Sequence, residues 1–179
     1  MKKNEYNRVL MLITDLVIAV ALMIFDQYSK QLAIANLKGK EAIVLIDEWL
    51  QLEYLENRGS AFGILQNQKL FILFISLIFM GFMVFFILRL PLWRKFVFAH
   101  VFLSMIISGG IGNAIDRLKF DYVVDFIYVV KIRFPIFNFA DCCVVVGVFG
   151  MLFLFLFVYK ESDLDFLKFK RNRRRELGR

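Results

Sequence analysis

The sequence predicts an integral membrane protein, mainly α-helical, with four transmembrane helices and a small β-rich subdomain between the first and the second. Hydrophobic residues make up 60% of the 179 residues, above the ~45–50% that is usual for a soluble domain. Charged residues gather in short clusters, and long apolar runs holding many of the 22 phenylalanines separate these clusters. Both observations argue against a soluble enzyme.

Four apolar runs are long enough to cross a bilayer, whose ~30 Å hydrocarbon core needs a helix of ~20 mostly apolar residues. They occupy about residues 9–25, 70–88, 96–115 and 139–159. The first run follows a basic start, and Ala33-Ile34-Ala35 has the form of a signal-peptide cleavage site. We expect this run to stay in the protein as a span, because it is longer than the ~7–15-residue core of a signal peptide and charged Asp26 and Lys30 precede the site.

The distribution of basic residues predicts the orientation of the four spans. With four spans, both chain ends lie on one side of the membrane. Most basic residues fall on that side, in the N-terminal segment, the turn at residues 89–95 and the tail at residues 160–179, whereas the other face is nearly neutral. Because cytoplasmic loops carry the excess of Lys and Arg, we expect cytoplasmic termini and extracytoplasmic larger loops. The basic tail is expected to lie near anionic lipid headgroups.

The formal net charge of +7 therefore reflects membrane topology and does not indicate a nucleic-acid partner. The sequence contains no helix-turn-helix pattern, aromatic-basic sheet motif or Cys/His finger spacing. The adjacent cysteines Cys142 and Cys143 lie inside an apolar run and cannot form a CxxC spacing. They are expected to pack as small hydrophobic residues.

The outward loop at residues 36–68 has the pattern of short strands. Residues 42–46 form a run rich in β-branched side chains, and residues 50–54 alternate between apolar and polar side chains. Asn57-Arg58-Gly59 then supplies a turn. We therefore expect two strands in this loop.

Polar and charged residues gather at the outer ends of three spans. Because ionisable groups at membrane depth are costly, they need partners or a purpose. Their common depth, where water and hydrocarbon are both accessible, suits chemistry on a membrane-embedded substrate. The group consists of Asp26, Lys30, Asn113, Asp116, Arg117, Asp125, Asn138 and Asp141.

Most of these residues also have a purely structural interpretation. Asp26 and Lys30 stand four residues apart and can form an ordinary helix-end ion pair. Asn138 followed by Asp141 is typical of a helix N-cap with an acidic third residue. The functional hypothesis depends on the coincidence of the whole group and on Asp125 and Asp141, which have no cationic neighbour in the sequence.

Two carboxylates at one interface can support acid–base catalysis of hydrolysis. Like charges ~4 Å apart repel by ~4 kcal/mol at an effective dielectric of 20, so such a pair shares one proton, as in aspartic proteases. The single histidine, His100, is expected near the other membrane face, which excludes Ser-His-Asp and Cys-His mechanisms and argues against a zinc site. Asp15 is expected to have a structural role there, with Thr14 or His100, in preference to a proton-relay role.

At these residues the sequence resembles the bacterial lipoprotein signal peptidases, also called signal peptidase II. Five blocks match the family's motifs in the family's order: DQYSK at 26–30, NRGSAFG at 57–63, GGIGNAIDR at 109–117, VVDFI at 123–127 and FNFAD at 137–141. The resemblance runs from the first span through the fourth. Cys142 and Cys143 depart from the small residues that are more usual after the last block, and the basic tail is long.

The resemblance implies an intramembrane aspartic endopeptidase of the bacterial cytoplasmic membrane, with its active site at the extracytoplasmic face. Its substrates would be diacylglyceryl-modified prolipoproteins, cut on the amino side of the lipidated cysteine, and Asp125 and Asp141 would form the catalytic pair. It implies no metal or cofactor, and inhibition by the cyclic peptide globomycin. The other motif residues would bind substrate or support the site: Asp26, Lys30, Asn57, Gly59, Asn113, Asp116, Arg117, Asn138 and Ala140.

Two other classes of function fit the same residues. A small four-helix transporter or lipid-handling protein could use the carboxylates as a proton relay. A non-catalytic membrane scaffold would keep its function after Asp125→Asn and Asp141→Asn, but not after replacement of the large phenylalanines in the second span.

Overall fold

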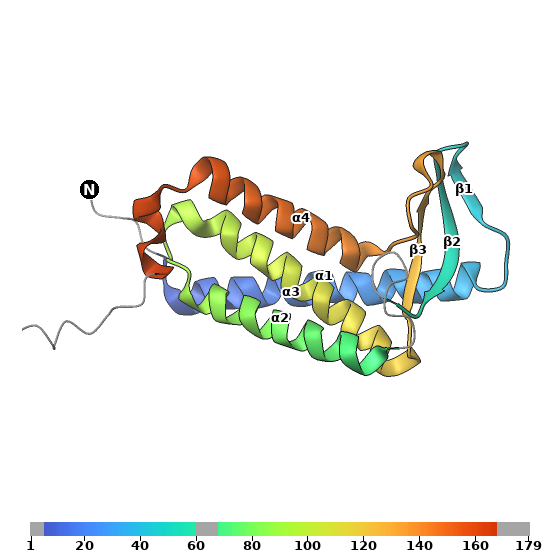
Figure 1. The fold of residues 1–179 in the computed structure, drawn as a ribbon, viewed down its shortest axis with the longest axis horizontal. Helices are drawn as coiled ribbons and strands as arrows, with labels where there is room; N and C mark the ends of the chain where they lie inside the picture. Colours follow the sequence, from blue (N-terminus) through green and yellow to red (C-terminus); the bar gives the residue numbers. More distant parts are fainter. Residues whose placement is uncertain (1–5, 60–67, 168–179) are drawn as a thin grey trace, which may run out of the picture.

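The computed structural model describes residues 6–59 and 68–167, which form a helical bundle with a small sheet at one end (Figure 1). The bundle consists of α1 (Arg8–Leu37), α2 (Lys69–Arg89), α3 (Val97–Phe120) and α4 (Phe139–Phe153), with a π-helical continuation of α4 at Leu154–Val158. The sheet consists of β1 (Ile43–Ile46), β2 (Leu50–Asn57) and β3 (Val123–Val129). Short 3-10 helices occupy Arg94–Phe96, Val130–Ile132 and Glu161–Leu167.

Within the part of the chain that the structure describes, four helical stretches are long and apolar enough to cross a membrane: Arg8–Leu37, Leu70–Arg89, Arg94–Phe120 and Phe139–Val158. The predicted fold class, mainly helical with four spans and a small sheet, is confirmed. The first helix is longer than the apolar run at residues 9–25, because Asp26 and Lys30 are buried against α3 and do not end the helix.

The third helix lies at the centre of the bundle. In the most hydrophobic window of each span, 56% of the α3 stretch is buried, against 17 to 22% for the other three. Gly112 lets α1 approach α3 closely, since a Cβ atom there would lie 2.5 Å from the Asp26 carboxylate. The outer faces of α2 and α4 expose large apolar side chains such as Phe74 and Phe149, as expected of surfaces that contact lipid.

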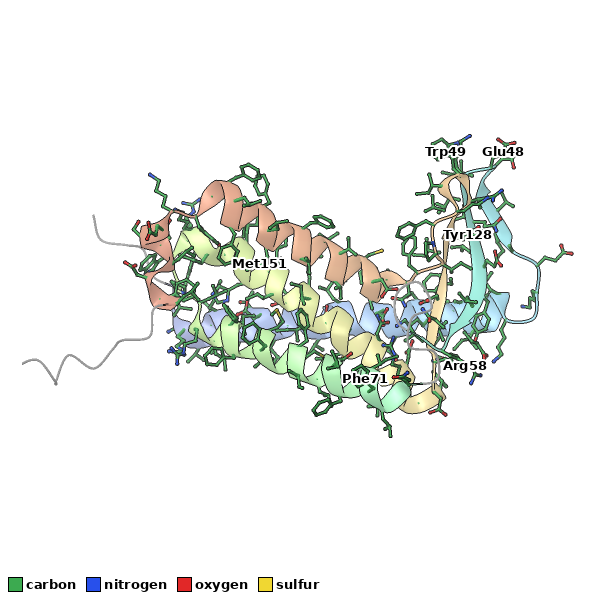
Figure 2. All side chains as sticks on the ribbon, in the orientation of Figure 1. Glu48, Trp49, Arg58, Phe71, Tyr128 and Met151 are labelled. Carbon is green, nitrogen blue, oxygen red and sulfur yellow. The ribbon has the colours of Figure 1, made fainter. Side chains whose placement is uncertain are left out.

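The sheet has the order β1-β2-β3, with both pairs antiparallel. It lies across one end of the bundle, with Glu48 and Trp49 at its far tip and Arg58 where it meets the helices (Figure 2). The two strands between the first two helices agree with the expectation from the sequence. The third strand comes from the connection between α3 and α4 and was not predicted from the sequence. Its pairing places Asp125 opposite Leu55 and Val123 opposite Asn57.

An aromatic cluster closes the opposite end of the bundle. Phe96 is fully buried, and its ring stacks on Tyr159 with the centroids 4.6 Å apart. Leu164 and Phe166, from the short helix that follows α4, pack against the same cluster. The first residues of the tail expected from the sequence are therefore folded onto the bundle, whereas residues 168–179 lie outside the described residues.

Candidate active site

Lys30 is the centre of a buried polar network at the sheet end of the bundle. Its ammonium nitrogen lies 2.9 Å from Asp26 Oδ2 and 3.0 Å from Asp116 Oδ2, and it donates to Asn113 Oδ1 at 2.9 Å. The side chains of Lys30, Asp26 and Asp116 are at most 2% exposed. Since a lysine has three N–H donors, all three are used here, and the charge of Lys30 is shared by two carboxylates.

The same two carboxylates connect the helices to the rest of the site. The backbone N–H of Ala140, in the first turn of α4, donates to Asp26 Oδ1 at 2.9 Å. The backbone N–H of Val124, on β3, donates to Asp116 Oδ2 at 3.1 Å. Lys30, Asp26 and Asp116 therefore fix the positions of the two segments that carry Asp125 and Asp141.

Gln27 also belongs to this network, although it is not among the site residues predicted from the sequence. Its side-chain amide donates to Asp116 Oδ1 at 2.9 Å and to the carbonyl of Gly112 at 3.2 Å. Its position inside the DQYSK block next to Asp26 was the only signal in the sequence that could have identified it.

Asp141 lies in the first turn of α4 and forms a capping box with Asn138. The Asn138 side-chain oxygen accepts from the Asp141 backbone N–H at 3.0 Å, and Asp141 Oδ2 accepts from the Asn138 backbone N–H at 3.2 Å. Asn113 donates its side-chain amide to Asp141 Oδ1 at 2.8 Å. The capping interpretation is thus correct, and the cap also fixes the direction of the Asp141 carboxylate.

Asp125 lies on β3 and is 1% exposed. Its Oδ2 accepts from the side-chain amide of Asn57 at 2.9 Å, and its Oδ1 accepts from the side-chain amide of Asn138 at 2.6 Å. Burial, and secondarily the charge of Asp141, raises the pKa of Asp125 to about 7, while the two amide donors partly oppose that rise. Asp125 therefore changes its protonation state near neutral pH.

Asn138 and Asn113 join the two carboxylates. Asn138 contacts both Asp125 and Asp141, and its side-chain amide also donates to Asn113 Oδ1 at 3.2 Å. Over residues 6–59 and 68–167, the hydrogen bonds to Asp125 and Asp141 come from asparagine amides and one backbone N–H, and no cation forms an ion pair with either carboxylate. Buried Asp125 and half-buried Asp141 are therefore linked through Asn138 and have only uncharged donors among the described residues.

Arg117 and Gly59 lie at the edge of this network. The Arg117 guanidinium donates to the Gly59 carbonyl at 3.1 Å and to the Asn113 carbonyl at 3.4 Å. The Gly59 N–H donates to Asn57 Oδ1 at 3.0 Å, which forms the turn expected at Asn57-Arg58-Gly59 and orients the Asn57 amide toward Asp125. Residues 60–63 of the second motif block lie outside the described residues.

The structure thus brings together all eleven site residues selected from the sequence. It places Asp15 and His100 elsewhere, bonded to each other at 2.8 Å. The two cysteines are free thiols, and Cys143 is buried, as expected of a small hydrophobic residue.

Comparisons with known proteins agree with this geometry. The family model described as signal peptidase (SPase) II matches residues 18–158. The chain is 41% identical to the lipoprotein signal peptidase of Clostridium tetani over 154 residues, covering 84% of this chain and 96% of that one. It is 40% identical to the lipoprotein signal peptidase of Streptococcus thermophilus over 144 residues, covering 80% and 91% of the two chains.

Solved structures give the same result for the fold. A bacterial membrane enzyme determined at 2.3 Å resolution by the in meso method superposes with a TM-score of 0.73 at 31% identity, covering 87% of this chain and 93% of that one. A second bacterial membrane enzyme structure, at 1.9 Å, gives a TM-score of 0.72 at 30% identity, covering 89% and 99%. The four apolar helices and these neighbours support a multi-pass membrane protein.

Proposed function

The chain belongs to the signal peptidase II family, whose activity is removal of signal peptides from prolipoproteins, and we propose that it does so as an intramembrane aspartic endopeptidase. Its substrate is a diacylglyceryl-modified prolipoprotein, which it cuts on the amino side of the lipidated cysteine. The observation that carries the proposal is the pair formed by buried Asp125 and half-buried Asp141, which Asn138 joins and uncharged donors hold.

Asp125 is the acid and Asp141 the base in the proposed first step. The raised pKa of Asp125, about 7, lets it keep a proton near neutral pH and donate it to the oxygen of the scissile carbonyl. Asp141 accepts a proton from water while the water oxygen bonds to the carbonyl carbon, which gives a tetrahedral diol. Asp141 then gives its proton to the amide nitrogen, and Asp125 takes a proton back from a hydroxyl of the diol. The C–N bond breaks in this step.

The polar network supports this step without taking part in it. Lys30 holds Asn113 Oδ1, so the other end of that amide donates to Asp141. A permanently fixed donor keeps the carboxylate aimed at one point, which is how preorganised sites avoid reorganisation during reaction. The mechanism needs no metal or cofactor.

We place the protein in the bacterial cytoplasmic membrane, with the sheet end of the bundle at the extracytoplasmic face and both termini in the cytoplasm. The basic residues of the opposite end support this orientation. The partners are lipidated prolipoproteins and membrane lipids, and globomycin is the expected inhibitor.

The proposed function predicts selectivity for the lipidated precursor. Purified protein in detergent should cleave a diacylglyceryl-modified prolipoprotein at least about 10²-fold faster than the same unlipidated chain, since remote binding energy is used to orient the reacting bond. Mass spectrometry of the products checks the position of the cut, and globomycin should block it. Equal rates for the two precursors would contradict the proposal, as would substrate flux in vesicles that persists with globomycin.

The proposed acid also predicts the pH dependence of cleavage. Because Asp125 loses its proton as the pH rises through about 7, kcat/KM should fall above that pH by about tenfold per unit. Initial rates on the lipidated precursor between about pH 5.5 and 9 check this limb of the profile.

Asn57→Leu is the matched variant for the pH prediction. The Asn57 amide stabilises the charged form of Asp125, so its removal should raise the pKa of Asp125 and move the alkaline limb to higher pH. A limb that stays in place, or moves to lower pH, would show that Asp125 does not control it.

A further inference from the structure

A second buried polar pair lies in the half of the bundle away from the sheet. His100 Nδ1, on α3, lies 2.8 Å from Asp15 Oδ2, on α1, and the two residues are 0% and 5% exposed. Asp15 precedes Asp26 by three turns of α1, a distance of about 16 Å along the helix. The pair is therefore separate from the active site, and the proposed reaction does not use it.

The location of this pair makes it unusual. Both residues lie inside stretches that are long and apolar enough to span a membrane. Ionisable groups at such positions are costly and are seldom kept without a role. A carboxylate beside an imidazole N–H forms a directional hydrogen bond, whereas apolar contacts have no preferred direction.

The face of α3 that contacts α1 carries polar or small residues at both of its ends. One end of this face holds His100, bonded to Asp15, and the other end contacts Asp26 and Lys30. Among the described residues, His100 Nε2 and Ser104 Oγ are buried without a hydrogen-bond partner, so Asp15 supplies the only direct bond to the His100 ring. Buried polar or small residues recur every four positions along α3: His100, Ser104, Ser108, Gly112 and Asp116.

We propose that Asp15 and His100 form a clasp that fixes the axial position of α1 against α3 and thereby aligns Lys30 with Asn113 at the active site. Both are positioning residues. The Lys30 ammonium must lie within hydrogen-bond distance of Asn113 Oδ1 for the Asn113 amide to donate to Asp141, and both contacts are short, at 2.9 and 2.8 Å. Buried polar groups set register in other helical assemblies in the same way.

Two substitutions of His100 distinguish the specific contact of Nδ1 with Asp15 from the mere presence of a polar side chain at this position. Asparagine places an amide nitrogen two bonds from Cβ, as Nδ1 is, whereas glutamine places it three bonds away, as Nε2 is. His100→Asn should therefore keep most of kcat and of the melting temperature. His100→Gln should lower kcat on the lipidated precursor by about tenfold to hundredfold, with KM little changed.

The pH profile distinguishes positioning from simple loss of folded protein. If Asn113 donates less well to Asp141, the ionised form of this base is less stabilised, and the acid limb of kcat moves to higher pH. Partial unfolding would lower kcat equally at every pH. Thr14→Val is the control, because Thr14 is exposed on the same helix and its hydroxyl donates to the Leu10 carbonyl one turn earlier.

If the single variants do not fold, the double variant Asp15→Leu with His100→Leu can be used in their place. It replaces both polar side chains with apolar ones and so leaves no buried charge unpaired. It should fold and still show the lowered kcat and the displaced limb. Wild-type kcat and pH profile in this double variant, or in a folded His100→Gln, would overturn the clasp, as would a loss of melting temperature alone.

The activity measurements rest on the proposed function, and the melting temperatures do not. If the wild type fails to cut the lipidated precursor, the proposed function fails. The Asp15→Leu, His100→Leu and double variants still test the clasp by their melting temperatures in detergent. A double variant less destabilised than the sum of the single ones supports the clasp, since contacting residues are not additive; additive losses would overturn it.

Discussion

Asp125→Asn and Asp141→Asn should each lower cleavage of the lipidated precursor by about 10³-fold or more. An amide at position 125 cannot supply the proton to the scissile carbonyl, and an amide at position 141 cannot accept one from water. Asparagine is close to aspartate in size, so the α4 cap and the contacts of β3 should largely survive. Single-turnover cleavage by purified protein, at equal amounts of folded enzyme, measures the effect.

Asp47→Asn is the control for this prediction, because Asp47 is an exposed carboxylate of the turn between β1 and β2. It should cleave at the wild-type rate. The double variant of Asp125 and Asp141 should be no slower than either single one, because residues that act as a unit are not additive. If one single variant kept most of the activity, the reaction could stand but the pair would be wrong, and Asp116 would be the next carboxylate to test.

Lys30→Met should destabilise the protein by about 3–5 kcal/mol, because it leaves buried carboxylates without their cation. Asp26 and Asp116 both lie within 3.0 Å of the Lys30 ammonium and are almost fully buried. Methionine keeps much of the length of the side chain but neither its charge nor its donors. Thermal unfolding in detergent measures the loss, and the fraction of protein extracted in folded form should fall with it.

Lys38→Met is the matched comparison, since Lys38 also pairs with a carboxylate at 2.9 Å. The Lys38 and Glu56 side chains are 50% and 30% exposed, and surface pairs of this kind contribute only about 0–1 kcal/mol. Similar losses for the two variants would contradict the account of Lys30. Restoration of stability by Asp116→Asn added to Lys30→Met would support it, because one unpaired charge would then be gone.

The sequence by itself determined the features that depend on local composition and spacing. The four spans follow from runs of apolar residues, since the free energy of transfer into a membrane adds up along a short segment. The Asp26–Lys30 ion pair and the Asn138–Asp141 cap each join residues three or four positions apart, so helix geometry alone brings them together. The motif blocks identified the residues of the site.

Only the tertiary structure decided which distant residues meet. The third strand depends on pairing between β2 and β3, which are far apart in the sequence, and this pairing brings Asn57 to Asp125. For Asp15 the sequence left Thr14 and His100 open as partners, and the packing of α1 on α3 decides for His100. A side-chain period shows which face of an element is buried, but not what it is buried against, so the partners of the two carboxylates follow from the packing of α1, α3, α4 and the sheet.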